Sequence, residues 1–265
     1  FLGFQTDVTD RKRTEQLVCL LNRVLRHNLR NEMNVVLGVG SHLRETGRDA
    51  DPAALGERLT GTADRMVDLS ERARELERYA RTEREPERLD PERVLSEVAA
   101  RYREQFPAAT VDVAVETDYG VCAGRELDRA LGELLENALK HATASEPRVS
   151  IEARTVAGTP ASDEHHSAEV AADGGPWVEL RVEDDGPGIA EAEAAVIERG
   201  EETQLEHGSG LGLWLVNWVV TRYGGSCQVH TAEDTGGTRV TLRLPAIEAD
   251  TPVEDAARPP TVLFR

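Results

Sequence analysis

The chain has 265 residues, of which 39% are hydrophobic, and this is enough for one large or two medium domains that each bury a core. Its formal net charge of −18 excludes a nucleic-acid or anionic-membrane binder, because phosphate groups would repel the chain as a whole. The acidic excess is spread along the sequence and almost all basic residues are arginine, so we expect a salt-adapted protein whose charge is screened by concentrated salt.

Three cysteines, Cys19, Cys122 and Cys227, lie far apart without metal-ligand spacing, which favours a reducing cytoplasm over a disulfide framework. No apolar run reaches membrane-spanning length, so the sequence predicts no membrane segment in this fragment. The chain begins at Phe1, which indicates a piece of a longer protein whose upstream part could still carry a membrane anchor. The expected location is the cytoplasm.

Residues 1–12, FLGFQTDVTDRK, alternate loosely like a strand, and Thr9 or Asp10 could cap the helix that follows. The run from Asp7 to Lys12 resembles the end of the last strand of a PAS sensor domain. A generic strand end is the alternative. The resemblance implies an upstream sensor domain and a signalling linker.

Residues 13–84 are expected to form two long helices. No proline interrupts residues 11 to about 47, and their apolar positions recur with helical spacing. The turn-forming GRDADP ends this helix, and a second helix begins near Pro52 with apolar residues at alternating steps of three and four. One helical hairpin cannot cover both apolar stripes, so two chains are expected to form a four-helix bundle. The sequence therefore predicts a homodimer.

The stretch RVLRHNLRN places His27 on the side of the first helix that faces away from the apolar stripe. An inert surface histidine is one interpretation. Arg23 and Arg30 lie one turn away on either side, where they disfavour imidazolium and would stabilise negative charge added to the ring. A neutral imidazole is a nucleophile, Asn28 can hold one of its ring nitrogens, and Asn31 could hold a water molecule.

Residues 85–246 alternate between helical and strand patterns, which predicts an α/β sandwich with a mixed sheet. Residues 156–176 are rich in Gly, Pro, Ala, Asp and Glu and predict a mobile loop. Residues 247–265 have no core pattern and are expected to form a disordered tail. The fold class is thus α+β in two domains, a dimerising antiparallel helical hairpin followed by the sandwich.

Polar side chains in the sandwich suit a metal-bound nucleotide. In ELDRALGELLENALKHA, Glu133, Asn137, Lys140 and His141 share one polar stripe of a helix. An amide oxygen suits Mg²⁺ and an ammonium group suits phosphate, although a solvated helix face would have the same pattern. In VEDDGPGI, Asp184 ends a strand where its carboxylate could accept a hydrogen bond from an exocyclic amine.

Glycines surround these polar groups in the sequence. Two follow Asp184 and permit a tight turn, and three in HGSGLGLWLV precede an apolar helix whose first N–H groups could bind phosphate. Ordinary loops are the alternative, and the TGGT stretch at 235–238 could be only a hairpin turn. The five glycines are Gly186, Gly188, Gly208, Gly210 and Gly212.

The order of these stretches resembles the H, N, G1, G2 and G3 boxes of the histidine-kinase/GHKL ATPase superfamily, over residues 1 to about 245. The resemblance implies a PAS-linked sensor histidine kinase of two-component signalling, of a salt-adapted archaeal type. It implies that the γ-phosphoryl group of Mg²⁺–ATP is transferred to His27 and then to an aspartate in the receiver domain of a response regulator.

The resemblance also assigns roles to single residues. It implies that Asn137 binds Mg²⁺ with Glu133 as a second candidate ligand, that Lys140 and His141 meet phosphates, and that Asp184 reads the adenine amine. The catalytic candidates are His27, Asn28 and Asn31. The other candidate ATP-binding residues are Gly186, Gly188, Gly208, Gly210, Leu211, Gly212 and Thr238.

Two residues depart from the family pattern. Asn28 stands where many members have an acidic residue as orienting base, which puts the rate of phosphorylation in doubt. Glu133 stands where many kinases have Asn, and related chaperone and mismatch-repair ATPases use a glutamate there to activate water. The alternatives are therefore an ATPase switch without phosphohistidine and a non-enzymatic dimeric scaffold. Asn31 fits a position that orients water, which implies phosphatase activity toward the regulator.

Overall fold

The computed structural model describes residues 25, 26, 28–45, 51–81, 85–157, 175–189, 211–232 and 234–260. The chain divides into two compact units, with the boundary after Glu83. The expectations for the PAS-like run, for His27, for most of the loop at 156–176 and for Gly208 and Gly210 fall outside the described residues. Within the described ranges, no helix combines the length and the apolar character that crossing a membrane requires.

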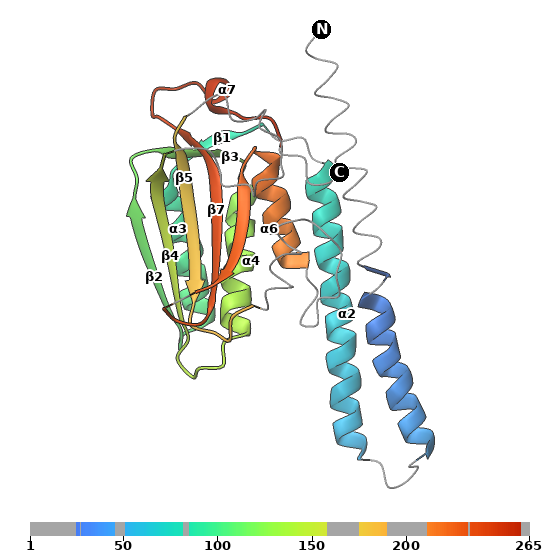
Figure 1. Cartoon of the computed structure of the whole chain (residues 1–265). Coiled ribbons are helices and arrows are strands. Elements are labelled where there is room, and N and C mark those ends of the chain that lie inside the picture. The colour runs from blue at the N-terminus through green and yellow to red at the C-terminus, as the bar shows by residue number, and fades with distance from the viewer. Residues whose placement is uncertain are drawn as a thin grey trace. The chain divides into compact units, whose positions relative to one another are not determined.

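The first unit contains a helix over residues 28–45 and the helix α2 (Pro52–Arg81). Val39 and Leu55 bury each other, and Leu59 packs against them. The guanidinium group of Arg65 donates to both carboxylate oxygens of Glu32, at 3.1 and 2.9 Å. Because the later position of one helix meets the earlier position of the other, the two helices run in opposite directions side by side (Figure 1).

The second unit is built on a seven-stranded sheet with the order β1-β3-β7-β5-β4-β2, and β6 also pairs with β7. β2 and β4 are parallel, whereas the other neighbours are antiparallel, so the expected mixed sheet is confirmed. The strands are β1 (Glu87–Leu89), β2 (Thr110–Glu116), β3 (Gly120–Ala123), β4 (Arg148–Val156), β5 (Trp177–Asp184), β6 (Ser226–Thr231) and β7 (Thr238–Ile247).

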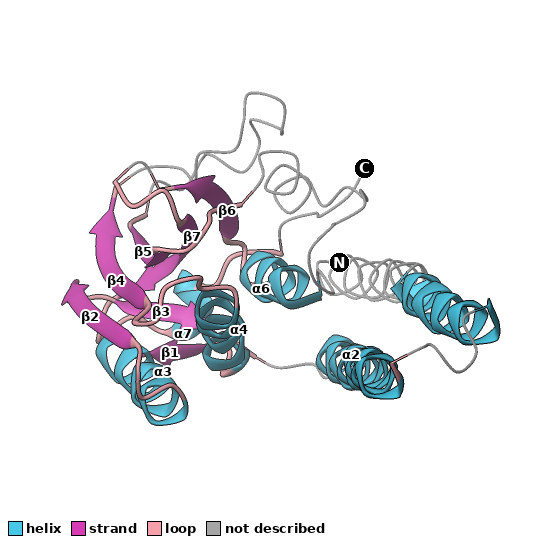
Figure 2. Cartoon of the chain, turned by 90° about the horizontal axis from the view of Figure 1, so that it is seen from below, coloured by secondary structure: helices cyan, strands magenta, loops and turns pink. Residues whose placement is uncertain are grey.

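Three helices, α3 (Pro91–Gln105), α4 (Glu126–Lys140) and α6 (Leu211–Arg222), cover one face of this sheet (Figure 2). The apolar residues of α3 and α4 recur at helical spacing, and the stripe of α4 is buried against the apolar residues of β4 and β5. Asp90 caps α3 by accepting a hydrogen bond from the backbone N–H of Glu92 at 3.0 Å. The largest fully buried apolar side chains of this core are Leu95, Leu127, Leu131, Leu135, Ile151, Leu180, Leu242, Leu244 and Ile247.

A buried carboxylate joins the start of α4 to the end of α6. Glu126 is only 2% exposed, and the hydroxyl of Tyr223 donates to its Oε1 at 2.5 Å. Arg222 adds its positive charge at 3.9 Å from the same oxygen. A Cβ at Gly124 would lie 2.1 Å from the Tyr223 hydroxyl, so only glycine fits there. This contact holds α4 and α6 at a defined spacing.

The expected disordered tail at 247–265 is wrong as far as residue 260. Residues 248–260 are described and include the short helix α7 (Val253–Ala256). The guanidinium group of Arg258 lies over the ring of Trp177 at 4.5 Å, and the thiol of Cys122 donates to the carbonyl of Val253 at 4.0 Å. Burial raises the pKa of Cys122 to about 11, so this thiol keeps its proton. The contact of Arg258 with Trp177 holds residues 248–260 against the sheet, and the hydrophobic pattern of a sequence does not reveal such a contact.

The sheet face away from the helices carries a buried carboxylate among arginines. Glu179 of β5 is 2% exposed, and it accepts hydrogen bonds from Arg154 of β4 and Arg243 of β7, each at 2.9 Å from Nε. Arg181 approaches it at 3.4 Å. Burial raises the pKa of Glu179, but the hydrogen bonds and charges of Arg154 and Arg243 outweigh burial and leave the pKa below its ordinary range.

Replacing Glu179 by Gln is expected to lower the free energy of unfolding by about 3 kcal/mol, because three guanidinium groups would lose their buried counter-charge. A carboxyl group with a lowered native pKa stabilises the fold fully above its unfolded pKa of about 4.3, and this contribution is lost as the pH falls through the native value. The difference between wild type and variant should therefore be full at neutral pH and shrink in acid. Urea unfolding across this pH range measures it.

Glu152→Gln is the matched control, because Glu152 lies on the same sheet face with its side chain 44% exposed and contacts only Arg181, at 3.9 Å, among the described residues. This control should cost less than about 1 kcal/mol, as exposed ion pairs do. Equal losses in the two variants at neutral pH would contradict a special role of the buried carboxylate.

Candidate functional site

The polar stripe of α4 runs from a buried end to an exposed one. Glu133 is 1% exposed and forms an ion pair with Arg129 at 2.5 Å, whereas Asn137 is half-buried. Lys140 is exposed and contacts Glu136, one turn before it. His141 follows as the last residue in helical conformation, and its N–H donates to the carbonyl of Asn137 at 3.1 Å. The stripe therefore presents an amide and, beyond it, an ammonium and an imidazole group.

Asp184 stands at the end of β5 with its carboxylate held by backbone donors. Its Oδ1 accepts the N–H of Gly186 at 2.8 Å and the N–H of Thr238 at 3.1 Å. The hydroxyl of Thr235 donates to the backbone carbonyl of Asp184 at 3.0 Å. A carboxylate has about four acceptor positions, so this side chain retains acceptor capacity for the amine of a ligand.

The TGGT turn at 235–238 packs directly on Asp184. A Cβ at Gly237 would lie 2.0 Å from the carbonyl oxygen of Asp184, so the turn approaches as closely as glycine allows. The pairing of β5 with β7, in which Glu183 faces Arg239, brings the turn to this point. The turn joins β6 to β7 as an ordinary hairpin turn would, and it also positions a site residue. The predicted site residues include Thr238 but not Thr235 or Gly237. The doubled glycine of the turn was the signal in the sequence that could have indicated them.

The chain leaves β5 through a glycine turn. Gly188 has a φ of +76°, a conformation that side chains other than glycine rarely adopt. A Cβ at Gly188 would also lie 2.8 Å from the carbonyl oxygen of Gly236. At Gly186 a Cβ would meet Asp184 Oδ1 at 2.9 Å. These contacts explain why glycine occupies positions 186 and 188, as the tight turn predicted from the sequence requires.

Asp184 is half-buried and surrounded by polar groups. Burial raises the pKa of Asp184 above its ordinary range, and the N–H donors of Thr238 and Gly186 only partly offset this effect. The negative charge of the neighbouring Asp185 raises the pKa further. A carboxylate that has lost much of its water gains most from a well-placed donor, so this group is suited to recognise an amine.

The structure brings together parts of four of the predicted stretches in the second unit. The helix α4 packs against β5, which ends at Asp184, and the turn at 235–238 lies on Asp184. Gly212 is buried in the first turn of α6, which packs against α4. The candidate residues Asn28, half-buried, and Asn31, exposed, belong to the helix over 28–45 in the other unit.

Residues 122–248 match the family described as the histidine kinase-, DNA gyrase B-, and HSP90-like ATPase. The chain is 28% identical over 229 residues to the two-component sensor PhoQ of Pseudomonas aeruginosa, covering 84% of this chain and 45% of that protein. It is 30% identical over 236 residues to the sensor-like histidine kinase SenX3 of Mycobacterium tuberculosis, covering 83% of this chain and 52% of that protein.

The crystal structure of full-length ShkA in complex with AMPPNP shares the fold with a TM-score of 0.51 and 23% sequence identity. The likeness covers 89% of this chain and 47% of that one. The chain thus spans about half the length of the relatives named here.

Proposed function

Since the chain belongs to the histidine-kinase/GHKL ATPase superfamily, we propose that it is the kinase part of a dimeric sensor that phosphorylates His27 from Mg²⁺–ATP. The bond between the β,γ-bridging oxygen and the γ-phosphorus breaks as a nitrogen of His27 bonds to that phosphorus, and ADP leaves with the bond electrons. An aspartate of a response-regulator receiver domain then accepts the phosphoryl group. This second step and a phosphatase activity that uses Asn31 are part of the same proposal.

The observation that carries the proposal is the fixed carboxylate of Asp184. Two backbone N–H groups hold Oδ1, so the side chain cannot turn, and the remaining acceptor capacity suits the exocyclic amine of adenine. The residues of α4 fit the other end of the nucleotide. The amide of Asn137 would ligate Mg²⁺, and Lys140 and His141 would meet the phosphates.

The contacts of Glu133 bear on the ATPase alternative. A glutamate that activates water needs contact with that water, whereas Glu133 is 1% exposed and its carboxylate is paired with Arg129. The same ion pair competes with a metal for Glu133, so the proposal relies on Asn137 as the metal ligand from this chain. Phosphohistidine formation is thus the better supported outcome of ATP binding.

Incubation of the chain with γ-labelled ATP and Mg²⁺ tests the proposal. Label that stays on the chain in base and is lost in acid is expected of phosphohistidine. Release of ADP and phosphate without label on the chain would instead identify an ATPase switch. A chain that binds no ATP in the presence of Mg²⁺ would be a scaffold. Addition of a cognate receiver domain should remove the label from a kinase.

Exposed apolar side chains on the first unit support the proposed four-helix bundle. The set on the helix over 28–45 and on α2 comprises Leu29, Met33, Leu37, Leu43 and Val67, which are 38%, 43%, 62%, 41% and 55% exposed in the single chain. Three of them recur every fourth residue and lie on one side of their helix. A second copy of the unit would cover this side, as in other antiparallel bundles.

Leu37→Glu is expected to convert the dimer to a monomer at micromolar concentration, because a charge would be buried in the bundle without a partner. Light scattering after size-exclusion chromatography measures the mass. His42→Glu is the control, since His42 is exposed on another side of the same helix, five residues after Leu37, and receives the same new residue. A Leu37→Glu chain that stays dimeric alongside this control would contradict the bundle.

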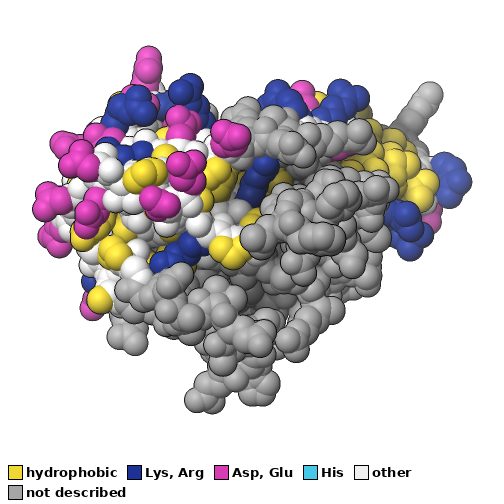
Figure 3. All heavy atoms as spheres, turned by 90° about the horizontal axis from the view of Figure 1, so that it is seen from above, with side chains coloured by type: hydrophobic (Ala, Val, Ile, Leu, Met, Phe, Trp, Pro, Cys, Tyr) yellow, Lys and Arg dark blue, Asp and Glu magenta, His cyan; other side chains and the backbone are white. Residues whose placement is uncertain are grey.

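Two features outside the site complete the proposal. The run Asp7–Lys12 would be the end of an upstream PAS sensor domain, and a salt-rich cytoplasm would be the setting of the protein. On the face shown in Figure 3, acidic side chains are scattered among basic ones and do not form a single acidic patch. Such scattering is compatible with the charge being carried as a general surface property.

A further inference from the structure

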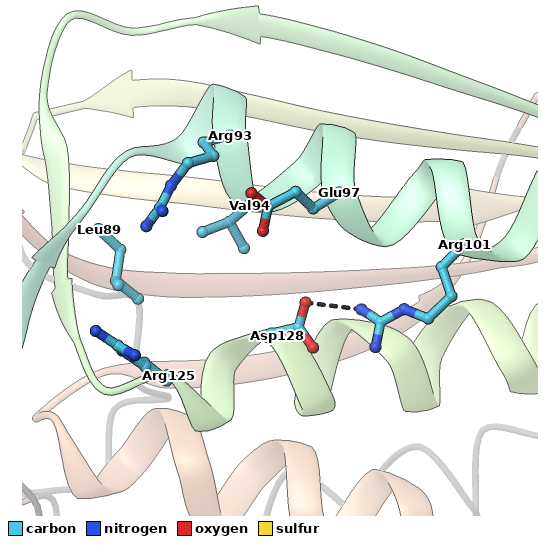
Figure 4. A pocket seen from close by; sticks show the side chains of 7 residues that line it. All are labelled: Leu89, Arg93, Val94, Glu97, Arg101, Arg125 and Asp128. Atoms are coloured by element: carbon cyan, nitrogen blue, oxygen red, sulfur yellow. Dashed lines mark hydrogen bonds and ion pairs between the residues drawn. The ribbon is translucent and has the colours of Figure 1, made fainter.

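A groove of about 620 Å³ lies between α3 and α4, apart from the residues proposed for ATP (Figure 4). Its volume falls within the range of small-molecule sites, about 300–1,000 Å³. The side chains that line it are those of Leu89, Arg93, Val94, Glu97, Arg101, Arg125 and Asp128. The charges of these side chains are arranged with positive groups at one end.

Two guanidinium groups converge at this end. Figure 4 shows Arg93 of α3 and Arg125, just before α4, both turned toward the space beside Leu89. Arg125 pairs with Glu87 at 2.8 Å, whereas Arg93 has no ion pair with any residue that the structure describes. Both arginines lie at helix N-termini, whose dipoles add positive potential. Two converging like charges are relieved by a planar anion, and guanidinium groups bind a carboxylate with two hydrogen bonds.

The middle of the groove has an uncompensated negative charge. Glu97 lies one turn after Arg93 on α3, and in Figure 4 Arg93 turns away from it. Glu97 has no ion pair within the described part of the chain, whereas Asp128 across the groove is held by Arg101 at 2.7 Å. An arginine that precedes a glutamate by four residues is the weaker order for a helical ion pair. An ammonium group would satisfy Glu97.

The wall between the two charged places is apolar. Leu89 and Val94 are 4% and 8% exposed, and they line the groove beside Arg93. We infer that the groove binds a zwitterion of the amino-acid class, with its carboxylate at Arg93 and Arg125, its ammonium at Glu97 and its aliphatic part on Leu89 and Val94. The ligand can be a free amino acid or a whole dipeptide, since each carries one ammonium and one carboxylate group.

Calorimetric titration of the full chain with L-leucine and with the dipeptide Leu-Leu tests the inference. We expect a dissociation constant of about 1 mM or lower for at least one of them, because both charges and the side chain find a partner. 4-Methylpentanoate lacks the ammonium group and 3-methylbutylamine lacks the carboxylate, and each should bind about tenfold more weakly. Binding of leucine alone identifies the free amino acid as the ligand form, and binding of the dipeptide alone identifies the peptide.

Arg93→Gln and Glu97→Gln should each weaken binding about tenfold, because each removes one charge contact while keeping the length of the side chain. Arg88→Gln and Glu104→Gln are the controls, since both residues are exposed nearby and do not line the groove. All four variants should bind ATP like the wild type, which separates this test from that of the kinase. The inference is overturned if neither zwitterion binds below about 10 mM. It is equally overturned if 4-methylpentanoate binds as well as leucine, or if the controls weaken binding as much.

Discussion

Replacing His27 by alanine is expected to abolish the acid-labile label that γ-labelled ATP leaves on the chain. Alanine has no lone pair to attack the γ-phosphorus, so the loss should be complete. Binding of ATP should be unchanged, because the proposed nucleotide residues all belong to the second unit and His27 belongs to the first. Label counting after gel separation, together with calorimetric titration of a non-hydrolysable ATP analogue, measures the two properties separately.

His42→Ala is the matched control for this prediction. His42 is exposed and lies on the helix over 28–45, so His42→Ala removes the same side-chain atoms from the same unit as His27→Ala. The control should label like the wild type. Label that survives in His27→Ala and disappears in His42→Ala would identify His42 as the phosphate acceptor and contradict the prediction. Equal label in both variants and the wild type would remove phosphohistidine from the proposal altogether.

Replacing Asp184 by asparagine is expected to weaken ATP binding about 100-fold, or by about 2.7 kcal/mol, with little effect on the fold. The amide oxygen can keep the hydrogen bonds from the N–H groups of Gly186 and Thr238. The amide nitrogen then replaces the second carboxylate oxygen, and it is a donor that faces the donor of the adenine amine. Calorimetric titration with an ATP analogue measures the loss, and thermal unfolding shows that the variant is folded.

Asp185→Asn is the control for the adenine contact. Asp185 is the next residue, and its Oδ1 accepts the N–H of Arg148 at 3.0 Å, which an amide oxygen can also do. This variant should bind ATP within about threefold of the wild type, because the proposed acceptor of the adenine amine at Asp184 is unchanged. Loss of the same size in both variants would mean that general negative charge matters, and not a specific acceptor at Asp184.

Several elements could be derived from local pattern alone. The strand and helix patterns within residues 85–246 predicted elements such as β4 and α4, because each period is set by backbone geometry. The glycine pattern after Asp184 also predicts a tight turn at Gly188, and this residue has a positive φ. These are local properties, since the residues that decide them lie within one element.

Contacts between distant segments could not be derived in this way. Thr238 donates to a carboxylate 54 residues earlier, and this depends on the register of β5 with β7. The cation of Arg258 over Trp177 orders a segment that has no apolar pattern. The burial of Glu133 changes the interpretation of a residue that looked like a metal ligand, because the sequence does not show which side of a polar stripe is buried.

Residue type and spacing alone establish which chemical groups this protein has: a histidine between arginines, an amide and an ammonium on one helix stripe, and a carboxylate before glycines. The packing of the elements decides which of these groups are buried and which stay accessible, because burial depends on neighbours from other elements. It also creates the groove between α3 and α4, whose lining side chains come from two separate stretches of the chain, 89–101 and 125–128.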